Sequence, residues 1–326
     1  MAPLFSLAGF GGGIASKLLG GSSPFATGGT ELEPGDGFKY HVFLSPGDFV
    51  INAAGGEVTY LIVGGGGAGG SSGSLHFPVP ALAPNYPGFS GGGGAGGVLT
   101  GTSELSDTTT YAITVGSGGG TTPRYSGPKG PTSNGQRGIA GGSSTFNSLT
   151  AFGGGGGGGY TAYGTATNAT VIGGSGGSGG GAGAKRQINP VRTGTGGSAP
   201  DPSQGNPGGD WISPTTWPSG RRGGGGGGAG GAGGTGGIPH NGSGGAALAV
   251  PAFPAPAILP AIPAPIQPSW SPDVGSTGLY GKGGPGGAPG RANGTDYTGM
   301  GGRGNKGGNG FAGGDGIVII KYPDSY

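Results

Sequence analysis

The sequence predicts an all-β protein, in which an antiparallel β-sandwich base carries glycine-rich, polyglycine II-like rods and long irregular loops, with almost no helix. Three observations lead to this prediction. Short segments rich in β-branched and aromatic residues recur along the chain, glycine runs lie between them, and one run keeps a strict period of three. Of 326 residues, 95 are glycine and 29 are proline, a proportion typical of low-complexity or fibrous chains.

The segments with strand character are bounded by Gly, Pro, Ser or Asp, which favour turns. Residues 45–48, SPGD, predict a turn after the first of them, and residues 103–108 predict another. Helix signals are nearly missing, since only residues 14–19 favour a turn or two of helix. The predicted strands are FKYHVFL (38–44), DFVIN (48–52), EVTYLIV (57–63), VLTGT (98–102), TTYAITV (109–115), STFNSLTAF (144–152) and GIVIIKY (316–322).

The glycine runs follow these strands in a repeated order. The strand at 57–63 leads into GGGGAGG (64–70), then a loop (71–90), then a second GGGGAGG (91–97) that enters the next strand. The same order of strand, glycine run, loop, glycine run and strand recurs between residues 109 and 152. Within residues 184–315 the sequence does not indicate which runs go up and which come down.

The period of three indicates what the glycine runs build. Polyproline II geometry has about three residues per turn and no internal hydrogen bonds, so bare glycine rods can bond one another through their backbones. Residues 227–238 read GGA GGA GGT GGI, which places Ala229, Ala232, Thr235 and Ile238 on one edge. We therefore expect residues 223–238 to form one scaffold rod, about 50 Å long at about 3.1 Å per residue. A flexible linker is the alternative.

Charge and composition exclude several classes of function. A net charge of +2 with 9% charged residues makes no case for nucleic acid or an acidic membrane as partner. Without cysteine, the chain has no thiolate zinc site and no thiol nucleophile. His41, His76 and His240 lack metal-ligand spacing, and the carboxylates form no convincing catalytic pair. The sequence predicts no enzyme, no cofactor, no metal site and no membrane span.

Four stretches carry a resemblance to a known family: DFVINAAGGEVTYLIVGGGGAGG (48–70), GGAGGVLTGTSELSDTTTYAITVGSGGG (94–120), GGSSTFNSLTAFGGGGGGG (141–159) and GGDGIVIIKY (313–322). Their order resembles the glycine-rich domains of bacteriophage tail-fibre proteins. The loops also look like those of the distal-tip receptor-binding adhesins of T-even-like phages, in which a polyglycine II sandwich presents variable loops to a bacterial receptor.

The resemblance covers about residues 38–322 and implies a place in the virion tail, acting at the host cell surface. It implies a bacterial surface protein or glycan as partner, together with other tail subunits. We expect a glycine-rich domain at 38–326 preceded by an N-terminal arm or attachment segment at 1–37, for which a signal peptide or simple disorder are alternatives. The sequence leaves open whether the chain forms a homo-oligomer.

Aromatic residues concentrate in the loops and the segments that follow them. Tyr and Trp are enriched in binding hot spots because they offer a large area with few rotatable bonds. We expect a contact surface for a receptor or partner, although each aromatic residue alone is as consistent with capping the bundle. The expected contact residues are His76, Phe77, Tyr86, Phe89, Tyr125, Tyr160, Tyr163, Trp211, Trp217, Phe253, Trp270, Tyr280 and Tyr297.

The proline-rich stretch 246–272 is the longest apolar part of the loops. Its proline spacing predicts an extended segment without helix. Three locations are consistent with it: against a receptor, against another virion subunit, or on its own domain. The predicted function is a non-enzymatic tail-tip adhesin, with a structural virion protein as the alternative and an ice-binding protein as a distant third.

Overall fold

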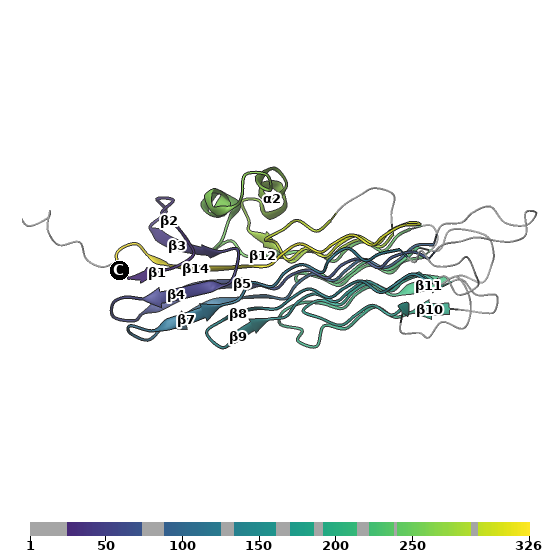
Figure 1. The fold of residues 1–326 in the computed structure, drawn as a ribbon, viewed down its shortest axis with the longest axis horizontal. Helices are drawn as coiled ribbons and strands as arrows, with labels where there is room; N and C mark the ends of the chain where they lie inside the picture. The colour runs from purple at the N-terminus through teal and green to yellow at the C-terminus, as the bar shows by residue number, and fades with distance from the viewer. Residues whose placement is uncertain are drawn as a thin grey trace, which may run out of the picture.

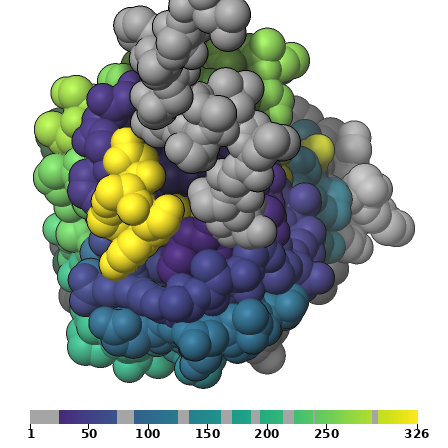
Figure 2. All heavy atoms as spheres, turned by 90° about the vertical axis from the view of Figure 1, so that its left-hand side faces the viewer, coloured from purple at the N-terminus to yellow at the C-terminus, as the bar shows by residue number. Residues whose placement is uncertain are grey.

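A computed structural model describes residues 25–73, 88–124, 134–160, 170–185, 192–213, 222–237, 240–287 and 293–326. The molecule is elongated, with a β-sandwich at one end from which long, nearly straight chain segments run to the other (Figure 1). We call the sandwich end the base and the opposite end the distal end. Figure 2 looks onto the base, where the C-terminal residues lie among the N-terminal strands.

The strands form antiparallel sheets, which confirms the all-β class. A five-stranded sheet has the order β2 (Thr30–Leu32), β3 (Phe38–Phe43), β14 (Ile317–Pro323), β5 (Glu57–Val63) and β6 (Val98–Glu104). A three-stranded sheet has the order β1 (Ala26–Thr27), β4 (Gly47–Ile51) and β7 (Thr110–Ile113). Two-stranded pairs are β10 (Arg192–Gly194) with β11 (Trp211–Ser213), and β12 (Leu248–Ala249) with β13 (Leu279–Tyr280).

Both faces of the five-stranded sheet are buried. On one face, Ile62 and Ile320 pack in a cluster with Phe49 and Ile113 of the three-stranded sheet. On the other face, Leu61 and Ile319 belong to a second cluster that includes residues of the proline-rich stretch. β14 is central and covered on both sides, which explains its continuous apolar run IVII where a half-exposed strand would alternate.

Residues 144–152 do not form the single strand that the sequence predicts. They form a hairpin of β8 (Ser144–Phe146) and β9 (Leu149–Ala151). The turn residues Asn147 and Ser148 have φ angles of 43° and 62°. Two residues with positive φ are what a tight hairpin turn of the matching twist requires, and Asn tolerates this conformation well.

The proline-rich stretch also corrects an expectation, because it contains helix. α1 (Ala255–Ile258), a 3₁₀ turn η2 (Leu259–Ala261) and α2 (Gln267–Val274) cover the outer face of the five-stranded sheet (Figure 1). Each begins with a proline at its first or second position, where no backbone N–H donor is needed, so proline favours these starts. Of the three predicted locations, the structure shows the third, on the chain's own domain.

The glycine runs form a polyglycine II lattice, as is clearest around the run 64–72. Amides 64, 67 and 70 donate to the run 91–97, amides 65, 68 and 71 to the run 136–142, and amides 66, 69 and 72 to the run 308–314. The N···O distances lie between 2.8 and 3.0 Å. Successive N–H groups therefore point to three neighbouring rods in turn, as a helix with three residues per turn demands.

The same rule extends through the bundle and gives the direction of the rods. In the run 91–97, amides 91, 94 and 97 donate to residues 158, 155 and 152, so these two rods are antiparallel. Amides 92 and 95 donate to residues 224 and 227, so that pair is parallel. These bonds orient rods in the stretch 184–315, whose directions the sequence leaves open.

The run 223–238 is not the single rod of about 50 Å that its period predicts. It turns back at Ala229, where Gly228 and Gly231 exchange hydrogen bonds of 2.9 and 3.4 Å, and Gly225 donates to Gly234. Ala229 packs against the apolar cluster at the base, so the rod ends where the sandwich begins. On the edge that the period of three predicts, Ala232 and Thr235 are exposed, whereas Ile238 lies outside the described residues.

Strands β1 and β2 lie within residues 1–37, the predicted arm, and extend both sheets at the base. Ala26 pairs with Ile51 and Thr30 pairs with Val42. Residues 1–24 lie outside the described residues.

Candidate functional site

The distal end gathers the ends of many rods. The described residues on both sides of segments 74–87, 125–133, 161–169, 186–191, 214–221 and 238–239 lie there. Hydrogen bonds join these flanks: Ser71 N–H donates to Gln136, Tyr160 N–H donates to Ser71, and Ala184 N–H donates to Phe89. Ile212 N–H donates to Gly236 in the same way. The lattice therefore brings segments far apart in sequence to one end of the molecule.

Buried serines end the lattice at this point. Ser72 Oγ lies 2.8 Å from the Gly88 carbonyl oxygen, to which it donates, and accepts the N–H of Gly307 at 3.0 Å. Ser90 Oγ donates to the Gly70 carbonyl and accepts the N–H of Asn305 at 2.8 Å. Hydroxyl groups supply the bonds that a neighbouring rod would otherwise make, so the rod ends stay in fixed positions.

Phe89 sits between cationic side chains at the distal end. The Arg222 guanidinium carbon and the Lys306 ammonium nitrogen each lie 5.5 Å from the centre of its ring. Phe89 also forms a β-bridge with Lys306. Cations within about 6 Å of an aromatic ring are attracted to its face, so Phe89 helps to hold two positive charges close together.

A small apolar cluster lies in the same region. It consists of Tyr160, Ala182, Ala184 and Trp211, with Trp211 only 1% exposed. The indole nitrogen of Trp211 is buried and has no hydrogen-bond partner, and the same holds for Nε of Arg222. Buried donors without an acceptor are uncommon in folded proteins and call for an explanation.

The predicted contact residues divide into three groups. Phe89, Tyr160 and Trp211 are distal but are buried, with 6%, 3% and 1% of their surface exposed. Phe253, Trp270 and Tyr280 are buried in the apolar cluster at the base, and Tyr297 packs against it. The third group lies outside the described residues: His76, Phe77, Tyr86, Tyr125, Tyr163 and Trp217.

The burial of the base group has a physical reason. The outer face of the five-stranded sheet is apolar, and the aromatic side chains of the proline-rich stretch cover it. Trp270 donates its indole N–H to the Tyr297 carbonyl at 3.2 Å, and Tyr280 donates its hydroxyl to the Phe253 carbonyl at 3.0 Å. These residues hold the fold together and leave little surface for a partner.

Sequence reasoning did not single out Ser72, Ser90 or Lys306. The signal for the serines is their place at the loop-side ends of the GGGGAGG runs, in GGSS and SGGGG. The signal for Lys306 is the short NK interruption within GGRGNKGGNG, which marks a turn between two rods that needs no long loop.

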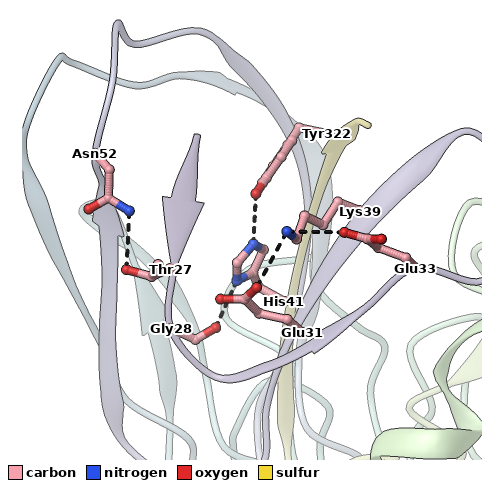
Figure 3. Close-up of polar contacts among 8 residues, drawn as sticks. All are labelled: Thr27, Gly28, Glu31, Glu33, Lys39, His41, Asn52 and Tyr322. Carbon is pink, nitrogen blue, oxygen red and sulfur yellow. Dashed lines mark hydrogen bonds and ion pairs between the residues drawn. The ribbon is translucent and has the colours of Figure 1, made fainter. Parts of the chain in front are cut away.

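A second polar cluster lies at the base, around His41 (Figure 3). Nδ1 of His41 lies 2.7 Å from the Gly28 carbonyl oxygen, and Nε2 lies 2.9 Å from the Tyr322 hydroxyl. Since a carbonyl only accepts, Nδ1 carries the proton and Nε2 accepts from Tyr322. Nearby, Lys39 Nζ lies 3.4 Å from Glu31 and 3.1 Å from Glu33. These contacts fasten the segment 26–33 to β3 and β14.

This arrangement is structural rather than catalytic in character. His41 is fully buried, and both its ring nitrogens are occupied, so it has no free position from which to exchange a proton with a substrate. Burial lowers the pKa of His41, against the opposing effects of the Gly28 carbonyl and the Glu31 carboxylate.

This lowered pKa predicts a pH-dependent stability. Below the unfolded-state pKa of about 6.5, the unfolded chain takes up a proton at His41 that the folded protein resists, so stability falls as pH falls, by at most about 1.4 kcal/mol per pH unit. His41→Gln should remove this dependence. Urea unfolding of both proteins at pH 7.5 and 5.5 measures it, and equal losses in the two proteins would contradict the expectation.

Within the described parts of the chain, no group of three or more His, Cys, Asp or Glu residues is placed to hold a metal ion. Among the same residues, no helix combines the length and the apolar character needed to cross a bilayer.

A family model described as a glycine-rich domain matches residues 44–323, which is most of the chain. No protein of curated function matches the sequence.

Proposed function

We propose that this chain, which belongs to the glycine-rich domain family, is a phage tail-fibre or tail-tip adhesin that binds a bacterial surface receptor at its distal end. The described base would face the virion, and the distal end would face the host cell. The binding itself needs no catalysis, cofactor or metal ion.

One observation carries this proposal. The polyglycine II lattice makes a shaft held together mainly by hydrogen bonds between backbone atoms, and it delivers many separate loop attachments to the end opposite the sandwich. Rigid scaffolds that present loops at one end are typical of recognition proteins, because loop sequences can vary while the scaffold stays the same. The phage origin is supported by the resemblance of residues 38–322 to tail-fibre domains.

The contact residues that we propose are those that the loops contribute at the distal end. They are His76, Phe77, Tyr86, Tyr125, Tyr163 and Trp217, all outside the described residues. The proposal leaves out Phe253, Trp270 and Tyr280, since these side chains are buried at the base.

Loop replacement tests the proposal. Purified protein is labelled and its binding to a panel of bacterial strains is measured by flow cytometry. Replacing residues 214–221 with a Gly-Ser segment of equal length should lower binding to a recognised strain by about tenfold or more, since this loop holds Trp217. The matched control is Ala53→Ser with Ala54→Ser, an exposed turn at the base, which should leave binding unchanged.

Two results would overturn the adhesin proposal. One is the absence of binding to every strain. The other is unchanged binding after replacement of each distal loop in turn, and phage particles that lack the protein but still adsorb normally would then indicate a structural virion component instead.

A further inference from the structure

Positive charge is concentrated at the distal end, although the net charge of the chain is only +2. Arg222 and Lys306 flank Phe89, and Lys185 follows Ala184, whose N–H donates to Phe89. The backbone N–H of Arg124 donates to Oδ1 of Asn309 at 2.8 Å, and Asn309 belongs to the turn that contains Lys306. Arg303 precedes Asn305 by two residues in the same segment. We call these five residues the distal cations.

Negative charge is concentrated at the base. Of the 13 Asp and Glu residues of the chain, Asp210 is the one that lies at the distal end. The others belong to the sandwich strands and turns, to helix α2 or to the places where rods enter the sandwich: Glu31, Glu33, Asp36, Asp48, Glu57, Glu104, Asp107, Asp201, Asp273, Asp296, Asp315 and Asp324. The sequence ranges outside the described residues contain no Asp or Glu, so none of them adds a carboxylate that would neutralise the distal cations.

An independent observation points to a ligand at the same end. Nε1 of Trp211 and Nε of Arg222 are buried donors without acceptors in the described structure. The backbones of both residues lie next to Gly236. Gly236 forms a β-bridge with Trp211, and its Cα packs closely against the carbonyl oxygen of Arg222. Leaving such donors unpaired costs free energy, so a hydrogen-bond acceptor that reached either of them would stabilise the distal end.

The surface chemistry favours a glycan over a protein as that ligand. Protein interfaces have a desolvated apolar centre, which requires apolar side chains at the surface. At the described distal end, Phe89, Tyr160 and Trp211 are buried, whereas the apolar side chain of Ile212 is 48% exposed. The cations are spread over several rods, so they could contact an extended polymer that carries repeated negative groups. Long-range electrostatic attraction would also orient the protein as it approaches such a polymer.

We propose that the distal end binds an anionic cell-surface polysaccharide through the distal cations, with Arg222 and Lys306 as the principal contacts. This inference rests on the proposed adhesin function and names its class of receptor. The polarity of the molecule would also turn its positive end toward a negatively charged cell envelope.

A matched pair of lysines tests this inference. Lys306 and Lys282 are both exposed and both have glycine-rich neighbours in the sequence, but Lys306 is distal and Lys282 follows β13 at the base. The probe is immobilised polygalacturonate, a carboxylate-bearing polysaccharide, with its neutral methyl ester as reference. Lys306→Gln should weaken binding about threefold and Arg222→Gln with Lys306→Gln about tenfold, whereas Lys282→Gln should have no effect. Circular dichroism checks that each variant is folded.

The outcomes separate this inference from the adhesin proposal. If the protein still bound cells at high salt and after the Lys306→Gln change, the adhesin proposal would stand. The inference of a polysaccharide receptor would then be overturned in favour of a protein receptor. If the protein bound polygalacturonate but no bacterial cell, the polysaccharide inference would stand and the adhesin proposal would be overturned. If Lys306→Gln and Lys282→Gln weakened binding equally, the attraction would be non-specific. If the protein associated with itself in a salt-sensitive way and did not bind polysaccharide, the acidic base of a second copy would occupy the distal end. Either result would overturn the inference.

Discussion

Replacing Gly93 with alanine is expected to destabilise the protein by about 3 kcal/mol or more, because overpacking costs and broken hydrogen bonds add. Gly93 is buried at the centre of the bundle, donates to Gly302 at 2.8 Å and accepts from Gly284 at 2.9 Å. A Cβ there would overlap the carbonyl oxygen of Gly67, in a third rod. Since backbone cannot move aside as a flexible side chain can, the rods themselves would have to separate.

Gly120→Ala is the matched control for this change. Gly120 is exposed, and the nearest atom to an added Cβ is Cδ1 of Ile139 at 4.0 Å. Alanine restricts the unfolded chain more than glycine does, so we expect a neutral or slightly stabilising effect. Chemical denaturation of both variants measures the difference. Similar stabilities would show that close packing of the rods is not what requires glycine.

Trp270→Ala is expected to cost about 4 kcal/mol, in the range of large-to-small changes in protein cores. Trp270 is fully buried between α2 and the five-stranded sheet and donates to Tyr297. The change removes the largest side chain by which the helices attach to the sheet. Loss of stability measured by thermal or chemical unfolding tests the conclusion that the proline-rich stretch belongs to the core.

Ser276→Ala serves as the control, since Ser276 is an exposed residue just after α2. Its effect should stay within about 0.5 kcal/mol. If Trp270→Ala proved as mild as Ser276→Ala, the helices would be attached loosely and the stretch would be available to a partner after all.

Much of the fold was predictable because local patterns and tertiary structure agree. Strands β3, β4, β5, β6, β7 and β14 fall where β-branched and aromatic residues cluster between turn residues. The alternation of strand, glycine run and loop predicted that rods leave the sandwich and return to it. The period of three predicted that Ala232 and Thr235 share one edge, and the structure shows that both are exposed.

The remaining features depend on contacts that a local pattern does not contain. The run 223–238 turns at Ala229 because it meets the apolar base, and its unbroken GGX phase gives no sign of that turn. The helices of the proline-rich stretch form because an apolar sheet face needs a cover, and proline is tolerated at their first turns. The same demand for burial places Phe253 and Trp270 inside, although their residue types are those of binding hot spots.

The gathering of the distal cations at one end was not predictable from the sequence for a related reason. A net charge of +2 is an average over the whole chain, and the separation of charge becomes visible only when the rods are given directions. Once the flanks of the loops are known to lie at one end, the same residues form one surface.

The three-way rotation of hydrogen bonds along each rod constrains how this protein can change its length. Amides 64, 67 and 70 face one neighbour while amides 65, 68 and 71 face another, so losing a single glycine would turn every later residue by a third of a revolution toward the wrong rod. Losing three would restore the pairing. Insertions and deletions within the shaft should therefore be tolerated in multiples of three and in neighbouring rods together, whereas the loops at the distal end are free of this reading frame.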